Sequence, residues 1–178
     1  MTFPSSASVT RFHNSHLAPL SEALLRVRTA EGTYPPAQDV MAEPVALAEW
    51  LMEEITLARW TALVDGTPAG HISLTKAHPY LLDALDSLGC RTYASYGFCE
   101  VSKFFTDPLH QHSGIGSTLF AAALQAGWDA GFHPTLAVID TSVAARSFYA
   151  AKGMREVGTF TGIHGVNHVF AAEPGADR

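Results

Sequence analysis

The most constraining feature of this chain is a glycine loop that joins a strand pattern directly to a helix pattern. Residues 98–106 (FCEVSKFFT) are typical of a β-strand, and Asp107-Pro108 ends it. A short loop of polar residues and glycine follows over 109–116 (LHQHSGIG). The loop opens into the clearest helical period of the chain, which runs to about residue 130. The strand is expected to place Glu100, Ser102, Phe104 and Thr106 on one face.

The elements after this helix fix how the strands are connected. Gly131 is placed to end the helix. Residues 135–139 (TLAVI) predict a buried strand, and residues 143–152 predict a helix that Thr141 or Ser142 could cap. This order predicts two neighbouring parallel strands joined by a right-handed crossover.

The first half of the chain indicates antiparallel pairing. Strand patterns over 58–64 and 69–75 flank Asp65-Gly66, a strong hairpin signal. Two helices are expected before the hairpin, one over about 16–30 and one that begins at Pro44 and carries a stripe through Leu47, Ala48, Leu51, Met52 and Ile55. Other strands fit residues 8–13, 154–160 and 166–171.

The sum of these elements predicts an α/β fold in a single domain over residues 1–172, with a flexible tail over 173–178. We expect a mixed, mostly antiparallel sheet of about seven strands, flanked by about four helices. The segment 76–95 has a short helix pattern, and its length fits a lid, a dimer element or a plain surface excursion.

Composition narrows the classes of function. The formal charge of −6 argues against nucleic acid as the main partner, because phosphate binding needs a basic face. Two cysteines, Cys90 and Cys99, make no disulfide framework and favour a reducing compartment. There is no signal-peptide pattern and no apolar stretch long enough to span a membrane, so a cytoplasmic protein without membrane contact is expected.

The loop Gln111-His112-Ser113-Gly114-Ile115-Gly116 has a physical interpretation of its own. Two glycines let the backbone approach a ligand closely, and the helix that follows presents unpaired N–H groups and a dipole that favour an anion. A phosphate site fits these features. A glycine-rich turn that only lets the strand and helix pack fits them as well. The nucleotide-hydrolase motif and the third glycine of a dinucleotide fingerprint are both missing.

The same loop resembles the Gln/Arg-x-x-Gly-x-Gly/Ala pyrophosphate loop of the GNAT (general N-acetyltransferase) superfamily. The preceding segment 104–108 (FFTDP) resembles the apolar strand that ends in Asp-Pro in this family. Downstream, residues 145–154 (ARSFYAAKGM) resemble its Ala-Arg-x-Phe-Tyr-x-x-x-Gly-Phe segment, with Met154 in place of the final phenylalanine. The detailed resemblance covers about residues 98–160.

The resemblance implies that acetyl-CoA is the co-substrate and that the two parallel central strands splay apart to admit its pantetheine arm. Backbone groups of the strand would bind that arm, and the glycine loop and the following helix start would bind the pyrophosphate. Ser142 stands where the family often has an asparagine that binds the arm, and Arg146 could reach the 3′-phosphate, although a solvated helix charge is the commoner fate of such an arginine. The expected donor-binding residues are therefore Phe104, Phe105, Thr106, Gln111, His112, Ser113, Gly114, Ile115, Gly116, Ser117, Ser142 and Arg146.

Two residues are candidates for catalysis. Tyr149 aligns with the family tyrosine that gives a proton to the coenzyme thiolate, and its alternative role is that of a core tyrosine beside Phe148. Glu100 lies where several family members place a carboxylate base that acts through water. Its alternative role is an edge carboxylate that faces solvent or pairs with Lys103 or Arg91. Histidines near the predicted strands are rival bases: His71, His164 and His168.

These residues predict transfer of an acetyl group from acetyl-CoA to a primary amine of a small molecule by direct attack on the thioester. A catalytically silent acyl-CoA-binding module and a protein N-terminal or lysine acetyltransferase remain as alternatives. No metal is expected, because His110 and His112 lack the further ligands of a metal site. The sequence leaves a homodimer open.

Overall fold

Seven strands form one mixed sheet in the computed structural model, which describes residues 6–32, 34, 43–92, 94–111 and 113–173. Their order across the sheet is β1-β2-β3-β4-β5-β7-β6. The pair β4–β5 is parallel, and the pairs β1–β2, β2–β3, β5–β7 and β6–β7 are antiparallel. The strands are β1 (Ala7–Arg11), β2 (Ala58–Val64), β3 (Thr67–Lys76), β4 (Phe98–Thr106), β5 (His133–Ile139), β6 (Met154–Gly162) and β7 (Gly165–Ala172). The predicted fold class is confirmed.

Five α-helices lie within the described residues, where the sequence predicts about four. They are α1 (Leu17–Glu31), α2 (Pro44–Met52), α3 (Pro79–Ser87), α4 (Ile115–Asp129) and α5 (Val143–Ala151). Among them, α3 corresponds to the short helix pattern of the segment 76–95. Both α2 and α3 begin with a proline, a position where the missing N–H has no helical partner in any case.

Contacts group the chain into two compact units. Unit 1 comprises Met1–Leu74 and Ser102–Ala123, and unit 2 comprises Thr75–Val101 and Leu124–Arg178. The chain therefore passes from one unit to the other inside β3, β4 and α4. The expectation of one domain over residues 1–172 stays a prediction, and most of the expected tail lies outside the described residues.

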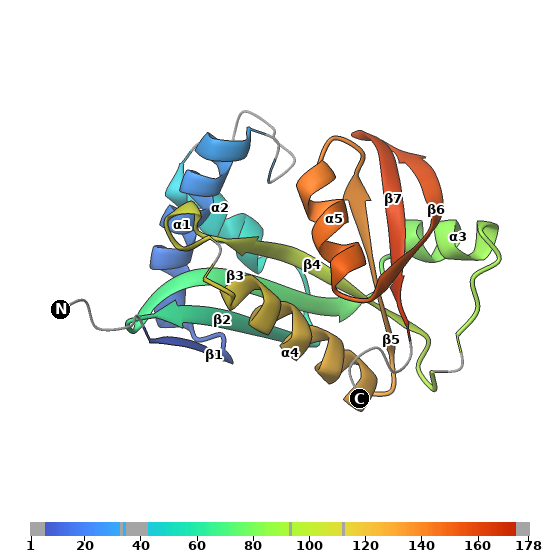
Figure 1. Cartoon of the computed structure of the whole chain (residues 1–178), viewed down its shortest axis with the longest axis horizontal. Coiled ribbons are helices and arrows are strands. Elements are labelled where there is room, and N and C mark those ends of the chain that lie inside the picture. The colour runs from blue at the N-terminus through green and yellow to red at the C-terminus, as the bar shows by residue number, and fades with distance from the viewer. Residues whose placement is uncertain (1–5, 33, 35–42, 93, 112, 174–178) are drawn as a thin grey trace. The chain divides into compact units, whose positions relative to one another are not determined.

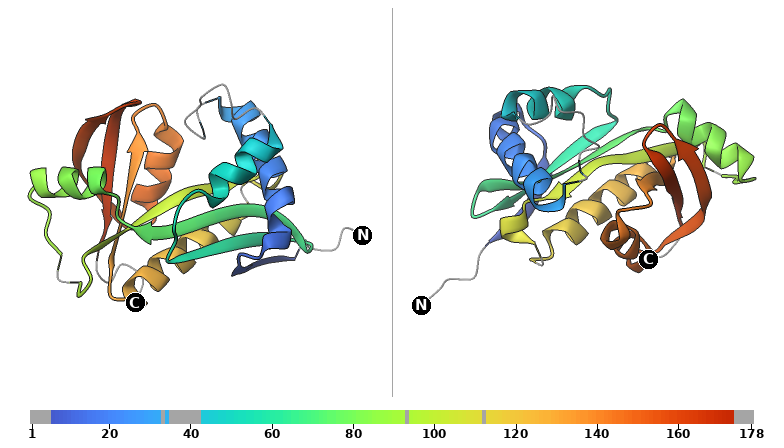
Figure 2. Two further views of the ribbon diagram at one scale, coloured as in Figure 1. Left: turned by 180° about the vertical axis from the view of Figure 1, so that it is seen from behind. Right: turned by 90° about the horizontal axis from the view of Figure 1, so that it is seen from above.

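In unit 1, helices cover both faces of the strands. The helices α1 and α2 lie side by side on one face (Figures 1 and 2). Their apolar stripes form a core with Phe105 of β4, and full burial of each leucine in it contributes about 1.5–3 kcal/mol. The start of α4 covers the other face, where Leu119 lies next to Gly70 of β3. The core residues are Leu20, Ala23, Leu24, Val27, Leu47, Leu51 and Phe105.

The predicted stripe of the second helix is only partly correct. Leu47 and Leu51 are buried as expected, but Met52 is exposed and Ile55 is 96% exposed. The reason is that α2 ends at Met52, so Ile55 lies beyond the last helical turn and does not share its buried face.

The predicted hairpin is confirmed. Asp65 and Gly66 both have positive φ angles, 49° and 79°, which is the backbone of the turn that matches the right-handed twist of paired strands. The register around this turn pairs Val64 with Thr67.

In unit 2, successive side chains of β7 contact two different helices, α3 and α5. Val169 packs into an apolar cluster with Leu81 and Leu85 of α3. The neighbours His168 and Phe170 point to the other face, where they contact Arg146 and Tyr149 of α5. Because successive side chains of a strand point to opposite faces, α3 and α5 lie on opposite faces of β7 (Figure 2).

Candidate functional site

The glycine loop of unit 1 has the backbone that an anion site at a helix start requires. Gly114 has φ +84°, a conformation that costs an L-residue about 1–2 kcal/mol, and nothing lies within 4 Å of the position that its Cβ would take. Ile115, the first residue of α4, is buried and anchors the helix. Gly116 is packed closely, since a Cβ there would lie 3.3 Å from Thr106 Cγ2 and 3.6 Å from Phe104 Cζ.

Polar groups around this loop are exposed or bonded locally. Gln111 is exposed and follows the short 3-10 helix η3 (Pro108–His110). The hydroxyl of Ser113 donates to the carbonyl of His110 at 2.6 Å, which closes the loop on itself. His112, the remaining predicted residue of the loop, lies outside the described residues. The first N–H groups of α4 begin directly after Gly114, so this helix start can accept an anion.

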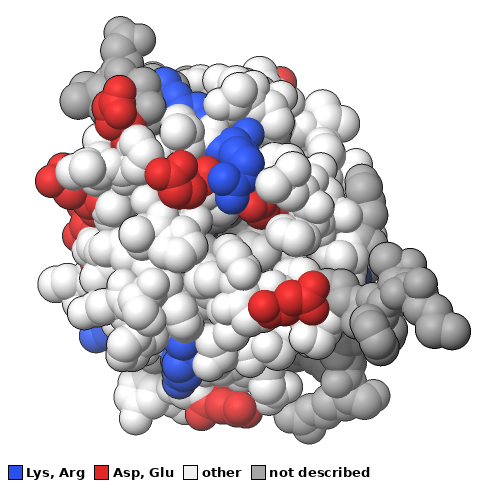
Figure 3. All heavy atoms as spheres, turned by 90° about the vertical axis from the view of Figure 1, so that its left-hand side faces the viewer, with Lys and Arg blue, Asp and Glu red and all other residues white. Residues whose placement is uncertain are grey.

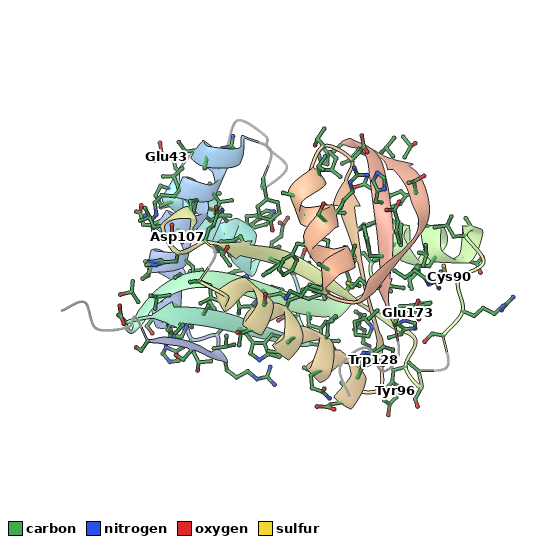
Figure 4. All side chains as sticks on the ribbon, viewed as in Figure 1. Glu43, Cys90, Tyr96, Asp107, Trp128 and Glu173 are labelled. Atoms are coloured by element: carbon green, nitrogen blue, oxygen red, sulfur yellow. The ribbon has the colours of Figure 1, made fainter. Side chains whose placement is uncertain are left out.

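The same loop is fixed to α1 by an ion pair. Arg26 donates through Nε and Nη2 to both carboxylate oxygens of Asp107, at 2.6–3.1 Å. Figure 4 shows Asp107 just after β4 and beside α1. Burial alone would raise the pKa of Asp107, but the hydrogen bonds from Arg26 and from the N–H of Leu109, with the positive charge of Arg26, hold it below its usual range.

The predicted single face of β4 is wrong at Ser102. Its hydroxyl donates to Glu54 Oε2 at 2.8 Å, while the next residue, Lys103, is buried on the same side and lies 3.7 Å from Glu54 Oε1. Two successive side chains share one side because Lys103 has φ +48°, which interrupts the alternation of the strand. Phe104 and Thr106 then turn toward the start of α4.

Lys103 is held by the end of α2. Its ammonium donates to the carbonyl oxygen of Trp50 and lies 4.7 Å from the centre of the Trp50 ring. Burial lowers the pKa of this lysine. The contacts stabilise the left-handed backbone at this point of the strand, just before the residues predicted to bind the pantetheine arm.

Glu100 is the centre of a buried polar cluster in unit 2. The residue is only 4% exposed, and its carboxylate accepts three hydrogen bonds. The Tyr80 hydroxyl donates to Oε1 at 2.5 Å, while the backbone N–H of His78 and its ring Nδ1 lie 3.2 Å and 2.7 Å from Oε2. None of these three bonds comes from Lys103 or Arg91, the partners considered in the alternative role of Glu100.

Sequence analysis missed His78 and Tyr80. Both precede Glu100 by about twenty residues, and the pair belongs to the start of α3, where His78 is the residue before the helix. The available signal was His78-Pro79, which marks a helix start, but no periodicity connects it with a residue on β4.

The cluster lies where the two parallel strands stop pairing. The register of β4 with β5 joins Phe98, Cys99 and Glu100 to His133, Pro134 and Thr135, and among the described residues it goes no further. Beyond Thr135, the described pairing of β5 is with β7. Glu100 is therefore the last residue of β4 that pairs with β5 in the described register, which fits the predicted splay of the central strands.

Tyr149 lies on α5 in the same unit as Glu100. Its ring contacts Phe170 of β7 and Phe148, with ring centres 5.9 Å and 5.7 Å apart. Ser142 is the N-cap residue of α5, but its side chain makes no capping hydrogen bond, and its backbone carbonyl accepts from the N–H of Arg146. Glu100, Ser142, Arg146 and Tyr149 belong to unit 2, whereas the residues of the glycine loop belong to unit 1.

Arg146 takes part in an ion-pair network. Its Nη1 lies 3.4 Å from Asp140 Oδ1 and 2.7 Å from His168 Nε2. The two nitrogens of His168 lie 2.6 Å and 2.8 Å from carboxylate oxygens of Glu156 and Asp140, and these hydrogen bonds raise its pKa. Arg146 and Glu156 also line an open pocket with Val143, Ser147, Ala150 and Phe170.

The rival base His71 is fully buried. Its Nδ1 lies 2.8 Å from the Lys103 carbonyl, and its ring stacks on Phe105. Burial lowers the pKa of His71 to about 4. A ring that solvent does not reach is poorly placed to receive a proton from an acceptor substrate.

The family model described as the acetyltransferase (GNAT) family matches residues 24–154. The chain belongs to this family. The matched range includes α2 and the elements on which the predicted donor site depends. These are β4, the glycine loop, α4 and α5. The suspected family resemblance is thereby confirmed.

Solved structures show the same fold. A GNAT-family acetyltransferase from Streptococcus agalactiae has a TM-score of 0.71 at 12% identity, covering 93% of this chain and 94% of that one. NAA60 of Arabidopsis thaliana in complex with acetyl-CoA has a TM-score of 0.69 at 13% identity, covering 93% and 97%. The PaiA N-acetyltransferase of Thermoplasma acidophilum in complex with coenzyme A has a TM-score of 0.62 at 16% identity, covering 94% and 99%. No curated protein matches the chain in sequence.

The described residues contain neither a candidate metal site nor a candidate membrane-spanning helix. In that part of the chain, no group of three or more histidine, cysteine or acidic side chains is arranged so that it could hold a metal ion. No helix in the part of the chain that the structure describes has the length and apolarity to cross a membrane. On the face drawn in Figure 3, the described positive and negative side chains are interspersed.

Proposed function

We propose that the protein is an N-acetyltransferase that moves the acetyl group of acetyl-CoA to the primary amine of a small molecule. The observation that carries the proposal is the glycine loop at the start of α4, with the positive φ of Gly114 and the close packing of Gly116 against β4. Membership in an acetyltransferase family supports it, as do structural neighbours that hold coenzyme A or acetyl-CoA.

The donor would bind through the residues named from the sequence. The N–H groups at the start of α4, with Gln111 and Ser113, would hold the pyrophosphate by hydrogen bonds and by the helix dipole. Backbone groups of Phe104–Thr106 would bind the pantetheine arm, and Ser142 is a further proposed contact of that arm. Arg146 would reach the 3′-phosphate only by giving up part of its contact with Asp140 and His168.

The reaction needs two proton movements. The neutral amine nitrogen attacks the thioester carbonyl carbon, a C–N bond forms, the C–S bond breaks and coenzyme A leaves as a thiolate. The protonated amine loses one proton before attack and a second as the amide forms. One of these returns to the thiolate, and Tyr149 is the proposed donor. Glu100 supplies the negative charge that draws the other proton away from the amine.

The environment of Glu100 supports a small acceptor over a protein surface. A carboxylate that is 4% exposed and covered by the start of α3 suits a narrow amine more than a flat peptide groove. Acetylation of a protein N-terminus or lysine, and silent binding of acyl-CoA, are outcomes that the experiment separates.

The first measurement is donor binding. Acetyl-CoA at ~100 times its dissociation constant should add about 2.7 kcal/mol of apparent stability, which raises the melting temperature by about 5–10 °C. Gly116→Val should abolish this rise, because a branched side chain would meet Thr106 and block the approach of phosphate. Ala121→Val, on the exposed side of the same helix, is the matched control and should keep it. A melting temperature that does not respond to millimolar acetyl-CoA would overturn the proposal.

The second measurement identifies the acceptor. Thiol release from acetyl-CoA should rise with at least one member of a panel of polyamines, aminoglycosides and amino acids, and mass spectrometry should detect the acetylated amine. Release only with lysine-containing or N-terminal peptides would change the acceptor class. Tight donor binding without release for any amine would indicate the silent module.

A further inference from the structure

Lys103 has a backbone conformation that is unusual inside a strand. Of the non-glycine residues that the structure describes, only Asp65 and Lys103 have a positive φ, and Asp65 belongs to the hairpin turn. Lys103 lies within β4 and has φ +48°, where an extended residue has a φ of about −120° to −140°. Such a conformation persists only where the surroundings enforce it, and residues of this kind gather at binding sites and active sites.

The end of α2 is one part of these surroundings. The Lys103 side chain is only 4% exposed, and its ammonium donates to the carbonyl oxygen of Trp50 and lies 4.7 Å from the centre of the Trp50 ring. Glu54 Oε1 lies 3.7 Å from the same nitrogen. Because Trp50 belongs to α2 and Glu54 follows shortly after it, the end of this helix holds the lysine side chain.

The carbonyl of Lys103 has a second anchor, on β3. His71 Nδ1 lies 2.8 Å from that carbonyl oxygen, and a carbonyl can only accept, so Nδ1 carries the hydrogen. The His71 ring is fully buried and stacks on Phe105, with ring centres 5.9 Å apart. The left-handed residue is therefore held at its side chain by the end of α2 and at its carbonyl by β3.

These two anchors determine the course of the backbone that follows. A peptide unit is planar, so the direction of the Lys103 carbonyl also sets the direction of the Phe104 N–H. The side chains of Phe104 and Thr106 lie against the start of α4, 3.6 Å and 3.3 Å from the position that a Cβ of Gly116 would take. An extended residue at 103 would restore the alternation of the strand and turn Phe104 to the side of Ser102.

We propose that Lys103 and His71 are positioning residues for acetyl-CoA, which hold residue 103 in the left-handed conformation and thereby direct the backbone of Phe104–Thr106 toward the pantetheine arm. The inference rests on the proposed acetyltransferase function. It assigns neither residue a contact with the acetyl group or a proton transfer. Their contribution is made before the donor binds, because a backbone that already has the binding conformation does not have to be ordered by the ligand.

The test compares Lys103→Ala with Lys103→Gly in the full chain. Both variants lose the contacts with α2, but glycine adopts a positive φ about as readily as a negative one, whereas alanine disfavours it. The fraction of Lys103→Ala with the binding backbone should fall, so the Kd of acetyl-CoA should rise by about 5–30-fold. Lys103→Gly should bind within about threefold of wild type. Lys76→Ala, at an exposed lysine of β3, is the control and should bind like wild type.

A second ligand separates positioning from a general loss of structure. ADP carries a pyrophosphate but no pantetheine arm, so its affinity, measured by titration calorimetry, should be the same in wild type, Lys103→Ala and Lys103→Gly. Melting temperatures without ligand show that each variant is folded at the temperature of the titration. An equal loss of acetyl-CoA and ADP affinity in Lys103→Ala would overturn the inference, as would an unchanged affinity for acetyl-CoA.

His71→Phe tests the second anchor. Phenylalanine keeps an aromatic ring against Phe105 but cannot donate to the Lys103 carbonyl, so the Kd of acetyl-CoA should rise by about 2–10-fold while ADP affinity stays the same. The nitrogen chemical shifts of the wild-type His71 ring should report a hydrogen on Nδ1, and a hydrogen on Nε2 instead would contradict its assigned role. If the wild-type protein does not bind acetyl-CoA, the proposed function fails first and the inference with it.

Discussion

Glu100 and Asp107 are two buried carboxylates on and just after the same strand, and their partners differ in kind. Asp107 in unit 1 is bonded by the guanidinium of Arg26, which keeps its charge at every physiological pH. Glu100 in unit 2 is bonded by an imidazole and a phenol, both of which can change their protonation. A carboxylate held by a permanent cation serves to fix a loop, whereas a carboxylate held by titratable groups can take part in moving a proton.

The largest expected effect is that of Glu100→Gln. The neutral amide cannot supply the negative charge that Glu100 is proposed to use in drawing a proton from the amine, so turnover should fall by about 10²–10⁴. Donor binding should be unchanged, because Glu100 is not among the residues proposed to bind acetyl-CoA. Steady-state kinetics with an amine acceptor and thermal shift with acetyl-CoA test the two parts separately. Full turnover in this variant would show that Glu100, like Asp107, has a structural role.

Tyr149→Phe extends the comparison to the proposed proton donor. The change keeps the ring contact with Phe170 and removes only the hydroxyl. Because a thiolate is a tolerable leaving group, turnover should fall by only ~10–10²-fold, with little change in donor affinity or melting temperature. Lost donor binding together with a lower melting temperature would show that Tyr149 is a packing residue.

Arg26→Met tests the structural side of the comparison. Asp107 would lose its charged donor, and the loss should be about 2 kcal/mol, reduced because the Arg26 side chain is 42% exposed. The melting temperature should fall by about 4–8 °C while kcat of the folded enzyme is retained. The pKa of Asp107 is lowered in the folded protein, so the pair stabilises above the unfolded pKa and its contribution is lost as pH falls through the folded value. The difference in melting temperature between wild type and variant should therefore shrink in acid.

The smallest expected effect concerns His168, whose pKa is raised by hydrogen bonds to Glu156 and Asp140. A raised folded pKa stabilises below the unfolded value, about 6.5, and the contribution is lost as pH rises through the folded value. His168→Gln should therefore lower the melting temperature more at pH 6 than at pH 9. Equal differences at both pH values would show that the imidazole in this network is neutral.

Local sequence signals were sufficient for most of the fold. A strand pattern, a glycine loop and a helical period lie next to one another in the chain and predict β4 and the start and length of α4. A separate helix pattern after the next strand predicts α5. The hairpin at Asp65-Gly66 followed from its turn residues. In each case the deciding interactions are between residues close in sequence.

The features that sequence did not reveal depend on tertiary contacts. The face reversal at Ser102 follows from the left-handed backbone of Lys103, which the end of α2 holds in place. The partners of Glu100 come from a helix start about twenty residues earlier, and no periodicity connects them. The exposure of Ile55 depends on where α2 ends.

The most direct test is the pH dependence of kcat/KM for the wild-type protein, Glu100→Gln and Arg26→Met with one amine acceptor. We predict that the wild type and Arg26→Met share one profile, which rises with pH and reaches a plateau when the base is deprotonated. Glu100→Gln should lack that plateau at neutral pH and follow the deprotonation of the amine alone. If Glu100→Gln retains the wild-type profile, the distinction between the two carboxylates is wrong and Glu100 is a structural residue.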